Sequence, residues 1–397
     1  MMEPASVNSA APRAFLRIGG LTLARQQLGL ALAMQCQKIV CIARAMSPEL
    51  IELQHVAEKA RAQFHVISGP RALIGLVTVA DEVIALNDGL FASSGEAIAA
   101  LEKGQAVLVQ PIEQGLAAGF ERIDLNYASA GAMRVPGRLV ERLAELPSDC
   151  DTASALQRIA LQAGINQRRL AVANGGGAFW TLVRSEDEAH ALEPQWIRQR
   201  TRDDGLLSPG RGLALFGVRA FGPALLHAGS GAGVVTLSAV VLASLGFGSG
   251  WFGLVPLGLA FCGLGWILRE AAVLLGRIES DLLAPPSRSG FTRQAAYGWM
   301  LDAIIVALAG WGSAPDLGQP DHDRMFAPLI LVALLRLVPK AVGGRWTSWL
   351  EDRALLCLGL AVAIIAGFGS EAVHLGALVL AIAGILIPRG EMRITRT

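Results

Sequence analysis

The sequence predicts an α/β domain with a mostly parallel sheet, followed by an all-α membrane domain of six transmembrane helices. Three observations predict this fold class. Of the 397 residues, 53% are hydrophobic and only 17% are charged, whereas soluble domains carry about 25% charged residues. Polar and apolar residues are mixed as far as Leu206, and the rest of the chain is mostly apolar. Short strand-like runs alternate with helical patterns in the first part, and the second part contains six long apolar stretches.

The α/β domain is expected to span residues 1–184. A helix is predicted to begin at Pro48, because Ser47 is a favourable N-cap and proline is favoured at the first helical position. Helices that alternate with short strands are typical of a largely parallel sheet. The expected helices are residues 22–34, 48–62, 138–146 and 152–163, and the expected strands are residues 38–43, 64–67, 77–80, 82–86, 106–110 and 178–183.

The membrane domain is expected at residues 231–397. A polar linker at 185–211 precedes it, followed at 212–230 by a segment that contains Arg219 and Pro223 and predicts an amphipathic interfacial helix. The six expected spans are residues 231–248, 252–275, 295–311, 327–342, 354–367 and 372–387.

The charges between these stretches predict the topology. With the α/β domain in the cytosol, the inside loops carry nine arginines and lysines, and the outside loops carry only Arg324. This bias follows the positive-inside rule. We therefore expect an integral protein of a bacterial-type inner membrane, with membrane lipids around it and both termini in the cytosol. The inside residues are Arg277, Arg288, Arg293, Lys340, Arg345, Arg353, Arg389, Arg393 and Arg396.

Several classes of protein are disfavoured. The net charge of +1 provides no basic field for nucleic acid. The five cysteines and six histidines lack the spacing of a zinc site, and their scatter does not indicate a disulfide framework. Residues 1–13 contain no long apolar run, so no cleavable signal peptide is expected.

Three segments carry a resemblance to a known family. In residues 15–43 a Gly-Gly turn leads into a helix and then a strand, and residues 180–208 combine an acidic run with the entry to the membrane domain. Gly298 and Asp302 fit the G-x-x-x-D half of a carboxylate signature. The chain resembles the CDP-alcohol phosphatidyltransferase family, in the bifunctional form with an N-terminal nucleotidyltransferase-like domain similar to inositol-phosphate cytidylyltransferases.

The resemblance implies transfer of a phosphoalcohol group with release of CMP. In the family, four carboxylates hold two divalent cations, Mg²⁺ or Mn²⁺, against the diphosphate of the CDP-alcohol, and the metals stabilise the leaving group. The resemblance also implies that the protein is a homodimer. Here Asp302 takes the catalytic and metal-binding position, but Val306 stands where the next carboxylate belongs. One register of the earlier half places Arg269 and Ala272 at the first two acids, and another places Asp281 and Ala284 there.

The N-terminal domain departs from its family in the same way. It lacks the G-x-G loop that cradles a triphosphate. The metal-binding aspartate matches either Asp81 or Asp88, and Asp88 also fits a simple Asn-Asp-Gly turn. Asn174–Gly177 is expected to be a turn. We therefore expect that this domain does not transfer nucleotides.

Each candidate site residue has two interpretations. Asp302 lies inside a span, where a charge is either functional or paired, for example with Arg277. The candidate phosphate-binding residues are equally consistent with snorkelling or with the positive-inside rule. These candidates are Arg269, Arg277, Arg288, Arg293 and Gly298, with Asp281 as a second metal ligand.

Three functions remain open. The first is a phosphatidyltransferase of phospholipid or inositol-phosphate metabolism with a divergent metal site that needs Mg²⁺ or Mn²⁺. The second is a non-catalytic protein that binds a lipid or nucleotide or acts as a scaffold, because both halves have lost signature residues together. The third is a small transporter, although the sequence contains no inverted repeat.

Overall fold

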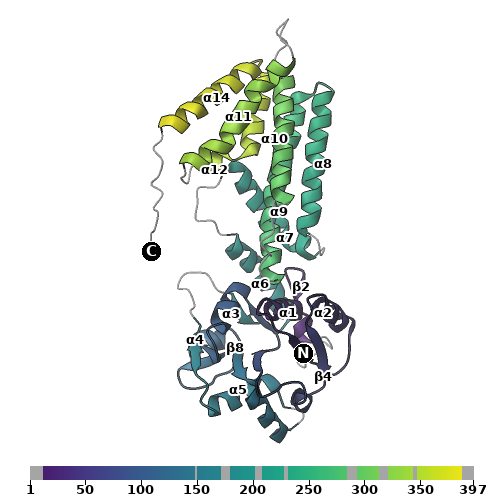
Figure 1. The fold of residues 1–397 in the computed structure, drawn as a ribbon, viewed down its shortest axis with the longest axis vertical. Coiled ribbons are helices and arrows are strands. Elements are labelled where there is room, and N and C mark those ends of the chain that lie inside the picture. Colours follow the sequence, from purple (N-terminus) through teal and green to yellow (C-terminus); the bar gives the residue numbers. More distant parts are fainter. Residues whose placement is uncertain are drawn as a thin grey trace. The chain divides into compact units, whose positions relative to one another are not determined.

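The computed structural model of the chain describes residues 12–147, 150–170, 179–201, 208–227, 231–283, 293–312, 321–342 and 347–386. The chain divides into two compact units, Met1–Arg200 with Ile278–Pro286, and Thr201–Arg277 with Ser287–Thr397. The first unit is α/β and the second is helical, as the sequence predicts (Figure 1).

The largest sheet of the α/β unit has four strands in the order β5-β8-β7-β9. Strand β8 (Tyr127–Pro136) runs antiparallel to both β5 (Glu82–Leu86) and β7 (Ala106–Pro111). Only β9 (Gln167–Arg169) is parallel to its neighbour in this sheet, β7. The expectation of a mostly parallel sheet is therefore wrong for this sheet. The parallel pair β3 (Lys38–Ile42) and β4 (Gln63–Ile67) forms a separate sheet.

The sequence pattern did not predict strand β8, which makes the sheet mostly antiparallel because it lies between β5 and β7. Its core is Ala-Ser-Ala-Gly-Ala, residues of low strand propensity. The buried indole of Trp180 lies against this segment, and its Nε1 donates to the Ala130 carbonyl at 2.6 Å. At Gly131, where φ is +69°, a Cβ would lie 2.7 Å from the Phe120 ring. The strand is thus specified by packing on both faces rather than by its own propensity.

Both faces of this sheet are buried. Val107, Val109 and Met133 face a core completed by α5 (Thr152–Gln162) and the 3₁₀ helix η3 (Gly137–Glu145). The intervening residues face a second core with α3 (Ser94–Leu101) and the antiparallel pair β6 (Leu90–Ala92) and β10 (Trp180–Leu182). This alternation explains why Ala106–Pro111 is almost continuously apolar.

The predicted start of one helix of this unit is confirmed. Helix α2 (Pro48–Lys59) begins as expected, with the Ser47 side chain accepting from the Leu50 amide. Thr22 caps α1 (Leu23–Ala33) in the same way. The expected strand at 77–80 is wrong, because the Thr78 amide binds the Asp81 carboxylate in a turn. The remaining small elements are η1 (Arg13–Phe15), η2 (Pro70–Leu73), α4 (Ile112–Ala117), and the hairpin β1 (Arg17–Ile18) with β2 (Leu21–Thr22).

Part of the expected linker is a packed helix. Residues Glu186–Arg200 form α6, which belongs to the α/β unit. Trp196 is buried and packs edge-on against the Phe91 ring, with 5.9 Å between centroids. The Glu193 carboxylate, also buried, accepts from the Gly19 amide at 3.0 Å. The segment was predicted to be a linker because its sequence is polar. Its Glu193 carboxylate is nevertheless buried, because it accepts a hydrogen bond from a backbone amide of the β1–β2 turn.

The helical unit places a helix over each of the six expected spans. Four are long and apolar enough to cross a membrane: Gly231–Trp251, Val255–Glu279, Arg324–Val342 and Gly369–Leu386. Two are shorter apolar helices, Ala295–Trp311 and Arg353–Ile365. The full elements are α7 (Pro209–His227), α8 (Gly231–Trp251), α9 (Val255–Leu283), α10 (Arg293–Trp311), α11 (Asp321–Val342), α12 (Thr347–Leu350), α13 (Arg353–Ile365) and α14 (Gly369–Leu386).

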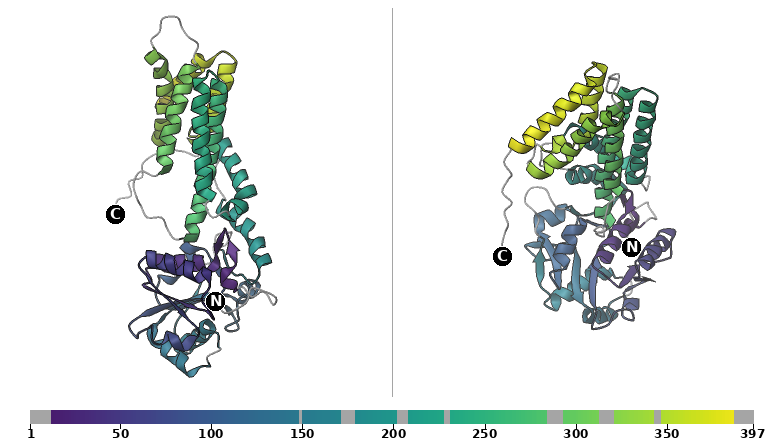
Figure 2. Two further views of the ribbon diagram at one scale, coloured as in Figure 1. Left: turned by 90° about the vertical axis from the view of Figure 1, so that its right-hand side faces the viewer. Right: turned by 45° about the horizontal axis from the view of Figure 1, so that its top comes forward.

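Small residues allow the helices of this unit to approach closely. Helices α8 and α10, and helices α11 and α14, lie side by side (Figures 1 and 2). At the α8–α9 crossing, a Cβ on Gly246 would lie 2.8 Å from both the Cys262 sulfur and the Gly258 carbonyl oxygen. Such close approach between glycines is common in membrane helix packing.

Candidate functional site

The candidate site is centred on the carboxylate of Asp302, in the middle of α10. Arg353 donates from Nε to Oδ1 at 2.7 Å and from Nη2 to Oδ2 at 3.3 Å. Arg336 of α11 donates from Nε to Oδ2 at 2.5 Å. Asp302 and Arg353 are each only 4% exposed. Three guanidinium N–H groups therefore satisfy a carboxylate that would otherwise be buried as an unpaired charge.

Asp352 and Arg353 together tie three other helices to α13. Asp352 is the N-cap of α13, where its Oδ1 accepts from the amides of Ala354 and Leu355. Its Oδ2 accepts from the amide of Gly210, at the start of α7, at 2.7 Å. The next residue, Arg353, reaches Asp302 on α10, which also holds Arg336 on α11. One dipeptide thus connects α7, α10, α11 and α13.

Arg336 is held in a second way, by an aromatic ring. Its guanidinium carbon lies 3.7 Å from the centroid of the Trp299 ring. Trp299 lies one turn before Asp302 on α10 and is 57% exposed. The ring stabilises the cation from one face while Asp302 accepts from its Nε edge.

This arrangement does not fit a divalent-cation site. A cation at Asp302 would lie against two guanidinium charges that already donate to both carboxylate oxygens. Val306, one turn further, packs against the apolar core of the helical unit. Among the residues that the structure describes, no group of three or more His, Cys, Asp or Glu side chains could hold a metal ion. The expected pairing of Asp302 with an arginine is present, but the partners are Arg336 and Arg353 rather than Arg277.

Two other candidates have defined surroundings. Arg269 of α9 pairs with its neighbour Glu270 and lies over the Trp266 ring at 4.7 Å, while its Nε is buried without a hydrogen bond. Gly298 is buried on α10, but a Cβ there would make only an ordinary 3.7 Å contact with Nη2 of Arg336. Packing therefore does not explain a glycine at that position.

The remaining candidates are not brought to Asp302 by any described contact. Arg277 is exposed on α9. Arg288 lies outside the described residues, as do the side chains of Arg293 and Asp281. Their roles, and the metal role of Asp281, stay predictions. The turns expected at Asn174–Gly177 and around 203–205 also lie outside the described residues.

The two aspartates considered for metal binding in the α/β unit occupy turns. Asp81 accepts from the Thr78 amide at 2.8 Å, and this hydrogen bond is the main reason that its pKa lies below the usual value. Asp88 belongs to the turn expected at residues 87–89, where Gly89 has a φ of +78° and the Leu90 amide donates to the Asn87 carbonyl.

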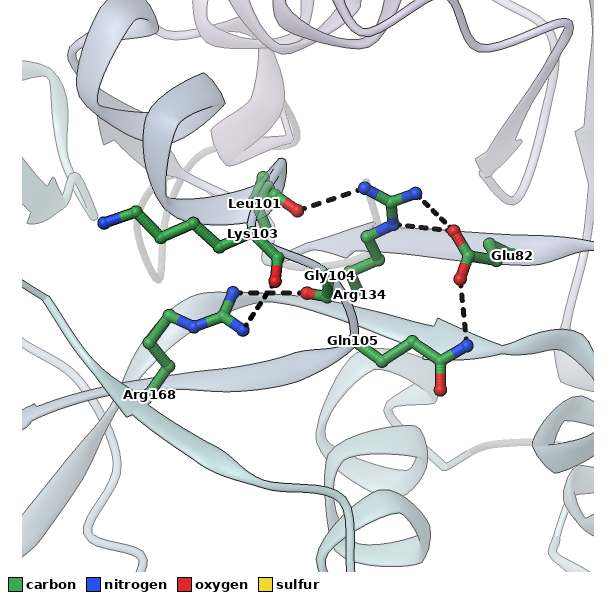
Figure 3. A network of polar contacts seen from close by, with 7 residues as sticks. All are labelled: Glu82, Leu101, Lys103, Gly104, Gln105, Arg134 and Arg168. Atoms are coloured by element: carbon green, nitrogen blue, oxygen red, sulfur yellow. Dashed lines mark hydrogen bonds and ion pairs between the residues drawn. The ribbon is translucent and has the colours of Figure 1, made fainter.

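Two arginines of the four-stranded sheet, Arg134 and Arg168, also have structural roles. Arg134 of β8 donates to Glu82 from Nε at 2.8 Å and to the Leu101 carbonyl at 3.2 Å, at the end of α3 (Figure 3). Arg168 of β9 donates to the carbonyls of Ala100, Lys103 and Gly104. Cations that satisfy the last carbonyls of a helix stabilise its C-terminus. Arg134 and Arg168 therefore use guanidinium donors to cap the C-terminal end of α3.

Sequence reasoning missed Arg336, Asp352 and Arg353 as site residues. A signal for Arg336 was present, because a charge within the apolar run 327–342 is as costly as Asp302 and calls for a partner. Arg353 was explained by topology alone, and Asp352 gave no signal beyond a good N-cap residue. The pairing itself depends on residues 34 and 51 positions from Asp302, which local pattern cannot reveal.

Comparison with protein-family models finds no match to this chain, and a search of curated proteins finds no relative. The class of protein that the fold itself defines is a membrane-associated chain with an N-terminal α/β unit and a helical unit that contains four candidate spans.

Proposed function

We propose that the chain is a non-catalytic membrane protein with the architecture of the CDP-alcohol phosphatidyltransferases. In this proposal Asp302 holds the helices together and does not carry a metal. The observation that supports it most directly is the set of three guanidinium hydrogen bonds to the Asp302 carboxylate. A metal-binding carboxylate needs free oxygen lone pairs and further acidic neighbours, and Val306 supplies neither.

The proposal includes six spans, with both termini in the cytosol of a bacterial-type cell. Helix α13 has 13 residues, which is about 20 Å and short of a hydrocarbon core of about 30 Å. Its first residue is Arg353, whose partner Asp302 lies in the middle of α10. We infer that α13 begins below the membrane surface, where Asp302 accepts hydrogen bonds from the Arg353 guanidinium and so compensates for its burial. Labelling of single cysteines placed in the loops, from either side of the membrane, tests this topology.

The catalytic test is CMP release by the purified full chain in lipid. The donors are CDP-diacylglycerol and CDP-inositol, offered with Mg²⁺ or Mn²⁺ and a panel of alcohols. The proposal expects release no faster than in protein-free vesicles. Metal-dependent release that is lost in Asp302→Asn and kept in Glu371→Gln would overturn it. Glu371 is a suitable control because it is an exposed carboxylate on the first turn of α14.

Metal binding gives a second readout that needs no substrate. The Mn²⁺ electron paramagnetic resonance signal reports free ion, so binding to the reconstituted protein reduces it. We expect equal signals with wild type and Asp302→Asn. Saturable binding that Asp302→Asn abolishes would instead support the competing proposal, a phosphatidyltransferase with a divergent metal site.

A further inference from the structure

Arg336 has hydrogen-bonding capacity that the described protein residues do not use. Its Nε donates a hydrogen bond to Asp302, and one face of its guanidinium lies over the Trp299 ring. Within the described residues, Nη1 and Nη2 have no hydrogen-bond partner, although the side chain is 27% exposed. Terminal guanidinium nitrogens in a fixed orientation are the donors that bind phosphate oxygens in pairs.

A second cation lies on the same face of α11. Lys340 is four residues after Arg336, so the two side chains are neighbours one turn apart. Lys340 is exposed, and its ammonium makes no ion pair with any described residue. Leu337, between them on the helix surface, is 62% exposed. The face therefore presents two positive groups beside apolar surface.

This face lies near one end of the helical unit. Arg336 is six residues from the last residue of α11, Val342, which corresponds to about 9 Å along the axis. Arg353, which shares Asp302 with Arg336, is the first residue of α13. Lys340 lies only two residues before Val342, so its long side chain extends the ammonium to the headgroup region, where exposed tryptophans are also common.

We propose that Arg336 and Lys340, with Trp299 beside them, bind the phosphate of an anionic phospholipid. The guanidinium Nη groups donate to the phosphate oxygens, Lys340 adds a second charge, and the acyl chains lie along the exposed apolar face next to Leu337. Asp302 holds the guanidinium in place, and it faces the Nε edge rather than the binding edge. The proposal does not depend on whether the unit transfers phosphoalcohols.

Quenching of Trp299 tests the proposal. The full chain is reconstituted in vesicles of phosphatidylcholine with increasing brominated phosphatidylglycerol, or with brominated phosphatidylcholine for comparison. Subtracting the signal of Trp299→Phe isolates this tryptophan from the others. We expect brominated phosphatidylglycerol to quench Trp299 at a several-fold lower mole fraction than brominated phosphatidylcholine does.

Variants at Lys340 assign the charge without touching the Asp302 cluster. Lys340→Gln should reduce the preference about fivefold, since one basic residue near an anionic surface contributes a factor of that order. Lys340→Arg should restore it. Lys103→Gln, which removes a lysine charge from the α/β unit, should leave the preference as in wild type.

Two results would overturn the proposal. Equal quenching by the two lipids would show that the face does not select anionic headgroups. Displacement of phosphatidylglycerol by millimolar inorganic phosphate at constant ionic strength would assign the site to a soluble phosphate compound instead of a lipid. Retention of phosphatidylglycerol under that condition supports the lipid as the source of the phosphate.

Discussion

Arg353 holds Asp302 with two hydrogen bonds, 2.7 Å from Nε to Oδ1 and 3.3 Å from Nη2 to Oδ2, although the residues are 51 positions apart. Both side chains are nearly inaccessible. A buried ion pair is worth most as a constraint, because removal of one partner leaves the other charged and unsolvated. The cluster therefore fixes how α10 and α13 lie against each other.

Loss of Asp302 should destabilise the helical unit strongly. Asp302→Leu leaves Arg353 buried without its partner, and breaking a buried pair costs about 3–5 kcal/mol. The double variant Asp302→Leu/Arg353→Met removes both charges and should recover much of this loss. Unfolding in mixed detergent micelles measures the difference. Equal stability of wild type and Asp302→Leu would contradict a structural role for the pair.

Gly210 should be required at the start of α7. A Cβ at Gly210 would lie 2.5 Å from Oδ1 of Asp352, so alanine there forces the carboxylate off its cap. We expect Gly210→Ala to lower the unfolding free energy by about 0.5–2 kcal/mol, the usual cost of a lost cap. Gly212→Ala is the control, because nothing lies within 4 Å of that position. A result in which both variants behave alike would mean that the Asp352–Gly210 contact contributes no stability.

The crossing of α8 and α9 should not tolerate a methyl group. Gly246→Ala places a Cβ against the Gly258 carbonyl and the Cys262 sulfur, and the backbone atom cannot move aside cheaply. Overpacking of this kind costs about 1–3 kcal/mol. Gly248→Ala, two residues along the same helix, enters open space and should be neutral. Thermal unfolding of the two variants in one detergent gives the comparison.

The α/β unit should lose stability as acid protonates Glu82. Hydrogen bonds from Gln105 and then Arg134 lower the pKa of this carboxyl below its usual value. A depressed folded pKa adds stability above the unfolded pKa, about 4.3 for glutamate, and that stability is lost as the pH falls through the folded pKa. Wild type should therefore be more stable than Glu82→Gln at pH 7, and the difference should shrink as the pH falls below the unfolded pKa.

Hydrogen exchange of peptides from β5 and β8, corrected for the intrinsic rate at each pH, measures this difference in the full chain. Glu102→Gln removes an exposed glutamate close by and serves as the control. If the advantage of wild type over Glu82→Gln did not shrink on acidification, the interaction with Gln105 and Arg134 would not depend on the charge of Glu82.

The sequence predicted the two-part architecture and the positions of the apolar helices, because hydrophobic periodicity and composition are local properties. It did not predict β8, where the Trp180 indole donates to the Ala130 carbonyl and the Phe120 ring leaves no room for a Cβ at Gly131. It placed α6 in a linker, because the burial of Glu193 depends on the Gly19 amide 174 residues away. Polar segments with distant partners are the part of a fold that local patterns cannot reveal.

The candidate site was also predicted only in its local features, and its distant partners were missed. Asp302 was recognised as costly within a span, and an arginine partner was among the alternatives. The partners proved to be Arg336 and Arg353, which lie on separate helices and meet only in the folded unit. The resemblance to a family pointed to Gly298 and Val306. The cost of a charge inside a span applies equally to Arg336, which made it a candidate partner for Asp302.

The hydrogen bond between Gly210 and Asp352 joins residues 142 positions apart, and this separation bears on biosynthesis. At about 5–20 residues per second, a ribosome adds Asp352 roughly 7–28 seconds after Gly210. Throughout that interval the first turn of α7 has to keep its amide in water or against the translocation machinery. The hydrogen bond that joins α7 to the start of α13 can therefore form only after α8 to α12 have been synthesised.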